Sequence, residues 1–223
     1  MNCRVLHVVR RFGPVGGMER YVWRLTSELL ELGVEIDILC QSIECDVDPR
    51  ITVHQLAPST DRRRWKAMRD FRDKCDKFWL EFEAKDDVIV HSHERCRFHH
   101  VTTFHGPPMP AWNQMVWYKR ISTRVAAWKR FEIAEVLGPN VRLVVPVSRY
   151  ISRRLALGYA DISDRLMPPG WPGLNPGQLQ TNRGEGYRVL FVGREWKRKG
   201  LDIAIQAFAK VRCDIPFATL DVY

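Results

Sequence analysis

The sequence lacks several features that would assign a function at once. It has no run of about 18 apolar residues, which excludes a transmembrane helix. The apolar run in MNCRVLHVVRRFG is too short, and its flank too basic, so we expect no signal peptide. The six cysteines have no paired spacing and fall mostly in strand-like or helix-like runs. We therefore expect buried thiols of a cytosolic protein rather than a disulfide framework.

Basic residues, by contrast, are in excess. The chain has 35 Lys and Arg against 26 Asp and Glu, a formal net charge of +9 over 223 residues. This charge predicts a polyanionic partner or surface, namely nucleic acid, anionic lipid or a phosphorylated substrate. Composition alone leaves these three alternatives open.

Short apolar runs alternate with amphipathic patterns along most of the chain. Strands are predicted at residues 5–9, 34–40, 51–56, 87–93, 100–106 and 141–148. Helices are predicted at 16–32, 62–84 and 111–137, and a further one is capped by Ser148 and ends at Gly158. This alternation predicts an α/β fold, a Rossmann-like parallel sheet with helices on both faces.

Apolar stripes set the expected inner faces of the first two helices. In the first helix the stripe consists of Val22, Leu25, Leu29 and Leu32, and Gly33 follows at the helix end. In the second it consists of Met68, Phe71, Cys75, Phe78 and Phe82. These side chains are expected to pack on the sheet.

Composition changes near residue 167. The stretch 167–186 is rich in Pro and Gly without periodicity, which is typical of a linker. Residues 187–223 then predict a single strand–helix–strand unit, which is too small to bury both faces of its sheet. The expected organisation is a first domain at 1–166, a linker at 167–186 and the start of a second domain at 187–223.

Two loops at strand ends are candidate ligand sites. The turn PVGGMER places Gly16 and Gly17 between the first strand and the first helix, where free N–H groups would face an anion. The alternative is a plain turn. His105 and Gly106 end the strand in TTFHG, and ligands gather at such ends in open α/β sheets. The alternative for His105 is a histidine that caps a turn.

Two motifs are candidate metal sites, and both are rejected. The run HSHERCRFHH offers His91, His93, Cys96, His99 and His100, but a lone cysteine and strand-alternating histidines do not fit structural zinc spacing. The Asp-Val-Asp at 46–48 lies in a polar turn and is only a tripeptide. We expect no metal site.

The segment 112–131 combines five cations with three tryptophans and no acid. Interleaved Trp and Lys or Arg suit the headgroup region of an anionic membrane. A core-packing helix with a solvated basic face is the alternative. No recognition module for nucleic acid accompanies the charge, so we expect no nucleic acid partner.

The stretch FVGREWKRKG is the most specific signal. It is no Walker loop, because Lys199 precedes Gly200 and no Ser or Thr follows. Arg194 leaves a strand after Gly193, and Lys199 lies at the next helix start. Two cations over helix N–H groups suit a diphosphate that gains charge as it departs.

Together these motifs resemble family 4 glycosyltransferases of the GT-B fold, especially bacterial enzymes of lipopolysaccharide and surface-polysaccharide synthesis. The resemblance rests on GGMER, TTFHG, VPVSRYISRRL, the linker and residues 189–209. It implies retaining transfer, without metal or other cofactor, from a nucleotide-sugar donor to a glycan or lipid-linked acceptor. It also implies a cytoplasmic protein, peripheral on the inner face of the cytoplasmic membrane.

The resemblance assigns roles to five residues. Gly16 and Gly17 match the loop near the donor phosphates, His105 matches the histidine at the reaction centre, and Arg194 and Lys199 match the pair that neutralises the departing diphosphate. Residues 169–172 depart from the family's Asn-Gly-Val-Asp turn. The family's Glu-x₇-Glu segment would lie beyond Tyr223, so we expect a C-terminally truncated chain. The alternatives are a non-catalytic or acceptor-binding subunit and a basic nucleic-acid-binding protein.

Overall fold

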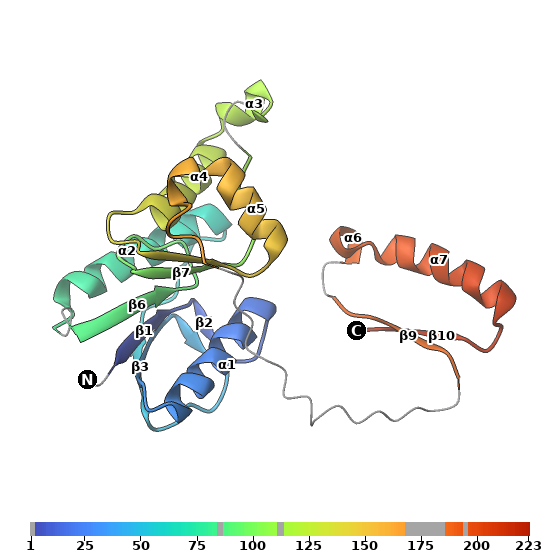
Figure 1. Cartoon of the computed structure of the whole chain (residues 1–223), viewed down its shortest axis with the longest axis horizontal. Coiled ribbons are helices and arrows are strands. Elements are labelled where there is room, and N and C mark those ends of the chain that lie inside the picture. The colour runs from blue at the N-terminus through green and yellow to red at the C-terminus, as the bar shows by residue number, and fades with distance from the viewer. Residues whose placement is uncertain (1–2, 84–86, 111–113, 168–185, 194–195) are drawn as a thin grey trace. The chain divides into compact units, whose positions relative to one another are not determined.

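The computed structural model describes residues 3–83, 87–110, 114–167, 186–193 and 196–223 (Figure 1). The chain divides into two compact units, Met1–Gly173 and Leu174–Tyr223, and each is described by itself. Most of the predicted linker, and Arg194, lie outside the described residues. No described helix has the length and apolar character needed to cross a membrane.

The first unit is built on a six-stranded sheet in the order β5-β3-β1-β6-β7-β8. Its strands are β1 (Arg4–Val8), β3 (Glu35–Cys40), β5 (Ile51–Gln55), β6 (Val88–Ser92), β7 (Val101–Phe104) and β8 (Leu143–Pro146). All neighbouring pairs are parallel. Short strands β2 (Arg11–Phe12) and β4 (Ser42–Ile43) form a separate parallel pair. The predicted Rossmann-like parallel sheet is confirmed.

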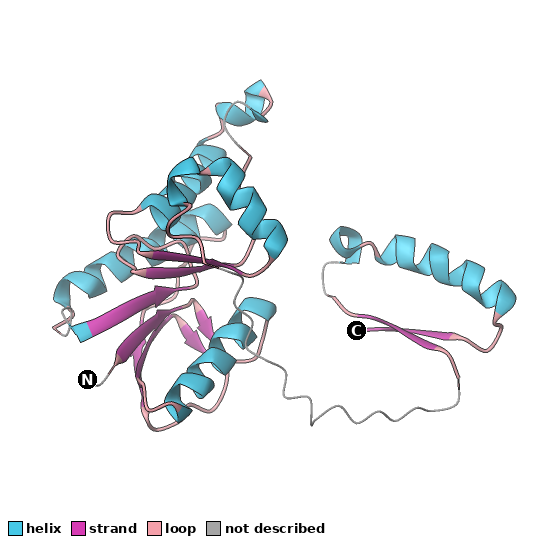
Figure 2. Cartoon of the chain, viewed as in Figure 1, coloured by secondary structure: helices cyan, strands magenta, loops and turns pink. Residues whose placement is uncertain are grey.

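Helices cover both faces of this sheet, as Figure 2 shows. Helix α1 (Gly17–Glu31) packs with Val5, Val9 and Ile38 in one apolar cluster. Helices α2 (Arg64–Glu81) and α4 (Thr123–Leu137) pack with Leu6 and Val8 in another. Successive residues of β1 therefore face opposite layers, as the alternation of side chains along a strand requires. Helix α5 (Arg149–Gly158) packs beside β8.

The helix ends follow the local sequence signals. The Oγ of Ser148 accepts a hydrogen bond from the backbone N–H of Ile151 at 3.3 Å, which confirms the predicted N-cap of α5. Gly33 follows α1 with φ of +77°, a left-handed conformation that favours glycine.

The inner face of α1 differs from the prediction. The buried residues are Val22, Thr26 and Leu30, whereas Leu32 is 78% exposed. The buried residues are spaced four apart, starting at Val22. Relative to the predicted stripe, the inner face of α1 is therefore displaced by about one residue, and it includes the hydroxyl of Thr26. For α2 the stripe is right, since Met68, Phe71 and Cys75 are buried.

The predicted single helix at 111–137 is wrong. A short helix α3 (Trp117–Arg120) is separated from α4, which begins after Ser122. Ser122 has an extended backbone, with φ of −74° and ψ of 119°, and acts as the N-cap position of α4. The Ser122 side chain makes no capping hydrogen bond, so the break rests on this extended backbone and on the low preference of serine for a helix interior.

The second unit holds one strand–helix–strand motif. Strands β9 (Arg188–Phe191) and β10 (Thr219–Val222) pair in parallel, joined by α6 (Trp196–Lys199) and α7 (Leu201–Asp214). Gly200 between the helices has φ of +76°, a left-handed backbone conformation that favours glycine. Leu190, Ile203 and Phe217 are each more than 60% exposed, as expected for a unit too small to bury its sheet.

The cysteines only partly follow expectation. All six are free, and Cys40, Cys75 and Cys96 are buried. Cys3 and Cys213 are exposed, however, because they lie before β1 and on the outer side of the small second unit.

Thr26 provides a test of the α1 packing. Its side chain is buried at 1% exposure, and its Oγ1 has no hydrogen-bond partner in the described part of the chain. Thr26→Val should raise the free energy of unfolding by about 1 kcal/mol, because it removes an unsatisfied buried hydroxyl. Thr26→Ser, which keeps the hydroxyl and loses the methyl, should lower it. Urea unfolding measures both, and a destabilised valine variant would contradict the packing.

Candidate active site

The candidate residues of the first unit gather where the strand order of the sheet reverses. From β1 the chain proceeds through β3 to β5 on one side, and later through β6 and β7 to β8 on the other. In open α/β sheets such a switch point, at the carboxyl ends of the strands, is where ligands bind. The turn after β1, the end of β6 and the end of β7 all meet this edge.

The glycine turn leaves the start of α1 open. Gly16 is the N-cap residue, and its carbonyl accepts the first helical hydrogen bond, from the N–H of Arg20 at 3.0 Å. A Cβ placed on Gly17 would meet nothing within 4 Å. The first backbone N–H groups of a helix have no partner within the helix, so this end suits an anion.

Glu19 also occupies this turn, a feature that the sequence reasoning missed. A Cβ on Gly16 would lie 2.2 Å from Glu19 Oε2, so residue 16 must stay small or Glu19 must move. Arg11 Nη2 donates to Glu19 Oε1 at 2.8 Å. A phosphate here would share the helix start with a carboxylate whose charge is partly offset by Arg11.

His105 lies directly after β7, as predicted. Its Nε2 is 3.4 Å from Nδ1 of His93, and the ring of Tyr21 from α1 meets it edge-on at 5.4 Å between centroids. Burial lowers the pKa of His105 to about 4, so the imidazole is neutral at pH 7. The site therefore presents a neutral imidazole against the N-terminal part of α1, the helix that the glycine turn opens.

The histidine run does not assemble as one cluster. His99 donates its Nε2–H to the backbone carbonyl of Glu135 at 2.9 Å, because a carbonyl oxygen can only accept. His100 Nδ1 accepts from the backbone N–H of Val90 at 3.0 Å. Cys96 belongs to the apolar core under α2. These three residues serve packing and backbone pairing.

His91 and His93 instead meet His7, which sequence reasoning missed. His7 and His91 are register partners on β1 and β6, and they are distant in the chain. Within the described ranges, these three histidines form a group whose potential ligand atoms all lie within 4.8 Å of one another, close enough for one metal ion. His91 Nε2 already contacts Thr103 Oγ1 at 2.8 Å, and His7 Nδ1 contacts His93 Nε2 at 3.2 Å. Each of the three rings thus has a hydrogen-bond partner.

A buried carboxylate anchors the loop that follows His105. Glu132 of α4 is 0% exposed, and its Oε2 accepts from the backbone N–H of Met109 at 2.8 Å. Its Oε1 accepts from Tyr159 Oη at 2.6 Å and from Lys129 Nζ at 3.2 Å. Lys129, one of the five cations of segment 112–131, therefore points into a buried network, as the core-packing alternative expects for this residue. A buried carboxylate needs cationic partners to offset its desolvation.

In the second unit, Lys199 ends α6 and is exposed. Its Nζ donates to the Val192 carbonyl at 3.4 Å, so its side chain folds back over the end of β9. Gly193 there has φ of +157°, and a Cβ on it would lie 2.3 Å from Lys199 Cδ. Glycine at 193 thus lets the lysine side chain cross the backbone. Lys197 on the same helix is also exposed.

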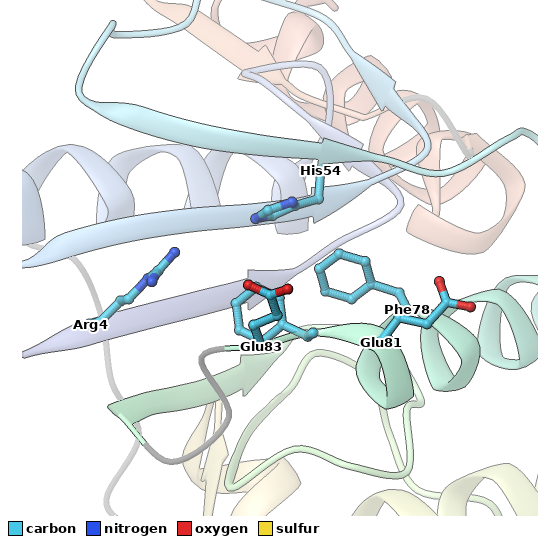
Figure 3. Close-up of a pocket in the computed structure, with 6 residues that line it drawn as sticks. Arg4, His54, Phe78, Glu81 and Glu83 are labelled. Carbon is cyan, nitrogen blue, oxygen red and sulfur yellow. The ribbon is translucent and has the colours of Figure 1, made fainter.

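Two other surface features lie away from this edge. A hollow of about 420 Å³ is lined by Arg4, His54, Phe78 and neighbouring residues at the carboxyl end of α2 (Figure 3). Arg4 marks the amino end of β1, whereas the glycine turn follows that strand. In the Asp-Val-Asp turn, Arg50 Nη2 binds Asp48 Oδ2 at 2.8 Å, and this pairing lowers the Asp48 pKa to about 2. Asp48 is thus engaged by an arginine.

A parallel sheet with helices on both faces and an open glycine turn at its switch point defines a Rossmann-like domain. A family profile agrees: Glycosyltransferase Family 4 matches residues 15–170. The chain belongs to Glycosyltransferase Family 4.

One solved structure shows the same fold. WaaG, a glycosyltransferase involved in lipopolysaccharide biosynthesis, matches with a TM-score of 0.80 and 18% identity, over 98% of this chain and 62% of WaaG. This chain therefore spans less than two thirds of the length of WaaG. A glycosyltransferase from Rickettsia africae ESF-5 has a TM-score of 0.48 and 16% identity, over 86% of this chain and 53% of that one. No curated protein sequence matches this chain.

The buried histidines predict acid sensitivity. Burial lowers the pKa of His7, His99 and His105 to about 4, and that of His91 and His93 falls well below its usual value. The stability from such groups is complete above an unfolded pKa of about 6.5 and is lost as pH falls toward 4. Burial raises the pKa of Glu135 to about 7 and also raises the pKa of Glu94 and of Asp76, which has the opposite sign but involves fewer groups.

Near pH 5 the unfolded chain should therefore bind about three more protons than the folded one, a loss of roughly 4 kcal/mol per pH unit. Urea unfolding between pH 7.5 and 5 measures this slope. His99→Gln should reduce it by about one proton, roughly 1 kcal/mol per pH unit. His100→Gln, at a less buried imidazole, should reduce it less. A stability independent of pH in this range would contradict the burial of these rings.

Proposed function

We propose that this chain is part of a retaining glycosyltransferase that moves a sugar from a nucleotide sugar to a lipopolysaccharide or surface-polysaccharide acceptor. The observation that carries the proposal is the contact of His105, at the switch point of a Family 4 chain, with Tyr21 of α1, the helix that the glycine turn opens. The lipopolysaccharide acceptor is inferred from the biosynthetic role given for WaaG. The first unit would bind the acceptor, and the second would contribute to the donor site.

Each site residue has a physical role in this proposal. Gly16 and Gly17 let the donor phosphates approach the start of α1, whose N–H groups favour negative charge. His105 lies beside the donor sugar as a neutral hydrogen-bonding group. Arg194 and Lys199 offset the charge that builds on the nucleoside diphosphate as the glycosidic bond breaks. The reaction needs no metal ion or other cofactor in this scheme.

A second candidate is an acceptor-binding protein that acts with a partner supplying the donor half. The exposed side chains of Leu190 and Phe217 in the second unit are the observation behind it, because a partner that supplies a donor half would cover them.

A fusion separates these candidates and tests Lys199. Residues 1–223 are joined to the remaining C-terminal part of WaaG, and labelled sugar transfer to a lipopolysaccharide acceptor is measured. Lys199→Ala should lower kcat about a hundredfold, equivalent to roughly 3 kcal/mol, with a smaller rise in the donor KM. The reason is that a fixed cation interacts more strongly with the departing diphosphate than with the bound donor.

Lys197→Ala is the matched control, since Lys197 is an exposed lysine on the same short helix. It should leave kcat within about threefold, as expected for a solvated charge. Wild-type kcat in the Lys199→Ala fusion would contradict the proposed role of Lys199 in offsetting the charge of the departing diphosphate. A product with inverted anomeric configuration would refute retention. Transfer only after mixing the chain with a separate donor half would favour the second candidate.

We further propose that the protein is peripheral on the inner face of the cytoplasmic membrane and docks through the α3 tip, defined as residues 116–124. Trp117 is 74% exposed and Ile121 is 75% exposed. Lys119 and Arg124 are exposed on the same segment. In Figure 1, α3 stands at the far end of the first unit from β3. Exposed tryptophan beside cations suits an anionic lipid surface.

Vesicle sedimentation tests the α3 tip. Binding to anionic vesicles should exceed binding to neutral ones and fall with salt, because each cation contributes about 1 kcal/mol near the surface. The double variant Trp117→Ala/Lys119→Ala should weaken binding at least tenfold. The control Trp196→Ala/Lys197→Ala removes a matched exposed pair from the second unit and should have little effect.

Equal partitioning to both vesicle types at low salt would rule out this docking. We propose no nucleic acid partner, so binding to DNA should be weak and independent of sequence. A nanomolar affinity for a defined sequence at physiological salt would favour that alternative.

A further inference from the structure

A row of three imidazoles connects the interior of the sheet to His105. His7 Nδ1 lies 3.2 Å from His93 Nε2, and His93 Nδ1 lies 3.4 Å from His105 Nε2. His7 is 0% exposed and His93 is 3% exposed. Each inner ring therefore has no access to bulk water, and its protons are shared within the row.

The sheet holds this row in place. His7 is in the middle of β1, and the backbone N–H of His93 donates to the Val8 carbonyl at 2.9 Å, which continues the pairing of β1 with β6. His105 follows the neighbouring strand β7 directly. The three rings thus extend from rigid, adjacent backbone segments, so their order along the row is set by strand register.

The number of protons on the three imidazoles allows only two patterns of hydrogen bonds along the row. A neutral imidazole has one N–H donor and one acceptor nitrogen. Burial keeps His7 and His93 neutral, because it lowers both pKa values well below their usual range. His93 uses both nitrogens, so the hydrogen bonds run in one direction along the whole row. They run either from His7 to His105 or from His105 to His7.

The unpartnered nitrogen of His7 decides between the two directions. His7 Nε2 is buried and has no hydrogen-bond partner among the described residues. If the row ran from His105 to His7, this nitrogen would carry a proton and bury an unpaired N–H. If the row ran from His7 to His105, His7 Nε2 would carry no proton and would leave only an acceptor electron pair without a partner. Buried N–H groups without partners are rarer than under-satisfied acceptors, and they cost their full desolvation.

We propose that His7 and His93 are positioning residues that hold His105 in the tautomer protonated at Nδ1. His7 Nδ1–H donates to His93 Nε2, and His93 Nδ1–H donates to His105 Nε2. His105 then has its own N–H on Nδ1, the nitrogen that does not contact His93. What Nδ1–H does there rests on the proposed function: it donates to an oxygen of the donor sugar or its phosphates.

This tautomer gives the site a fixed donor rather than an acid. His105 Nε2 is occupied by the His93 proton, so the ring cannot turn over to offer an acceptor without breaking that bond. The sugar's hydroxyl and phosphate oxygens accept hydrogen bonds, so a preset N–H matches them without rearrangement. Sequence position alone does not supply this feature, because an isolated strand-end histidine exchanges between tautomers.

Nitrogen-15 NMR of the chain as it exists tests the row without any activity. Two-bond proton–nitrogen correlations of the imidazoles distinguish Nδ1–H from Nε2–H tautomers, and selective substitution assigns each ring. We expect His7, His93 and His105 all to be protonated at Nδ1. His93→Leu should release His105 to an Nε2–H or mixed state. His93→Gln should preserve the His105 tautomer, because its amide can donate to one neighbour and accept from the other.

His99→Leu is the control, since His99 is a buried histidine hydrogen-bonded to a backbone carbonyl outside the row. It should leave the His105 signal unchanged. If His93→Leu does not fold, the wild-type spectrum alone decides. A His105 ring protonated at Nε2 in the wild type would overturn the proposal, whether or not sugar transfer is observed. So would stoichiometric uptake of added Zn²⁺ by His7 and His93, because the same nitrogens cannot also share a proton.

Discussion

The parallel pairing of β1 with β6 is the constraint on which the candidate site depends. The strand order of the sheet reverses between these two strands. The loops that follow β1 and β6 therefore begin side by side and then lead in different directions. The same pairing sets His7 opposite His91 and brings His93 to the Val8 carbonyl. A slip of one residue would turn each of these histidines to the opposite face, under α2 and α4. Strand register therefore determines the chemistry at this edge.

Burial then determines the charge state of the site. Helix α1 covers the face that carries His7, with Val22 and Leu30 in its apolar cluster and Tyr21 against His105. Removing water disfavours the charged imidazolium, so the histidines are neutral although the chain as a whole is strongly basic. In the proposed reaction, positive charge near a departing diphosphate would then come from guanidinium and ammonium groups and from helix N–H groups. The histidine of the proposed site would donate a hydrogen bond, and cations elsewhere would offset charge.

The opposite face of the sheet supports the same edge through polar contacts. Glu132 connects the loop after His105 to α4 and, through Tyr159, to the segment after α5. Because this carboxylate is buried, the loss of a partner would leave its charge less well compensated. The Glu132 side chain is therefore restricted to the position in which it contacts these partners. The basic segment that contains Lys129 consequently has two roles. Its outer part forms the exposed α3 tip, and its inner part belongs to the core.

The sequence by itself determined the alternation of strands and helices, the caps at Ser148 and Gly33, and the placement of His105 and the glycine turn at strand ends. These follow from local periodicity and backbone preference, which neighbouring residues decide. It did not reveal His7, Glu19 or the Glu132 network, because their partners are distant in the chain. Nor did it locate the break before Thr123 or the true inner face of α1, where packing against the sheet selects among similar helical faces. Only the tertiary structure decided which histidines meet, because strand register, not sequence spacing, brings β1, β6 and β7 together.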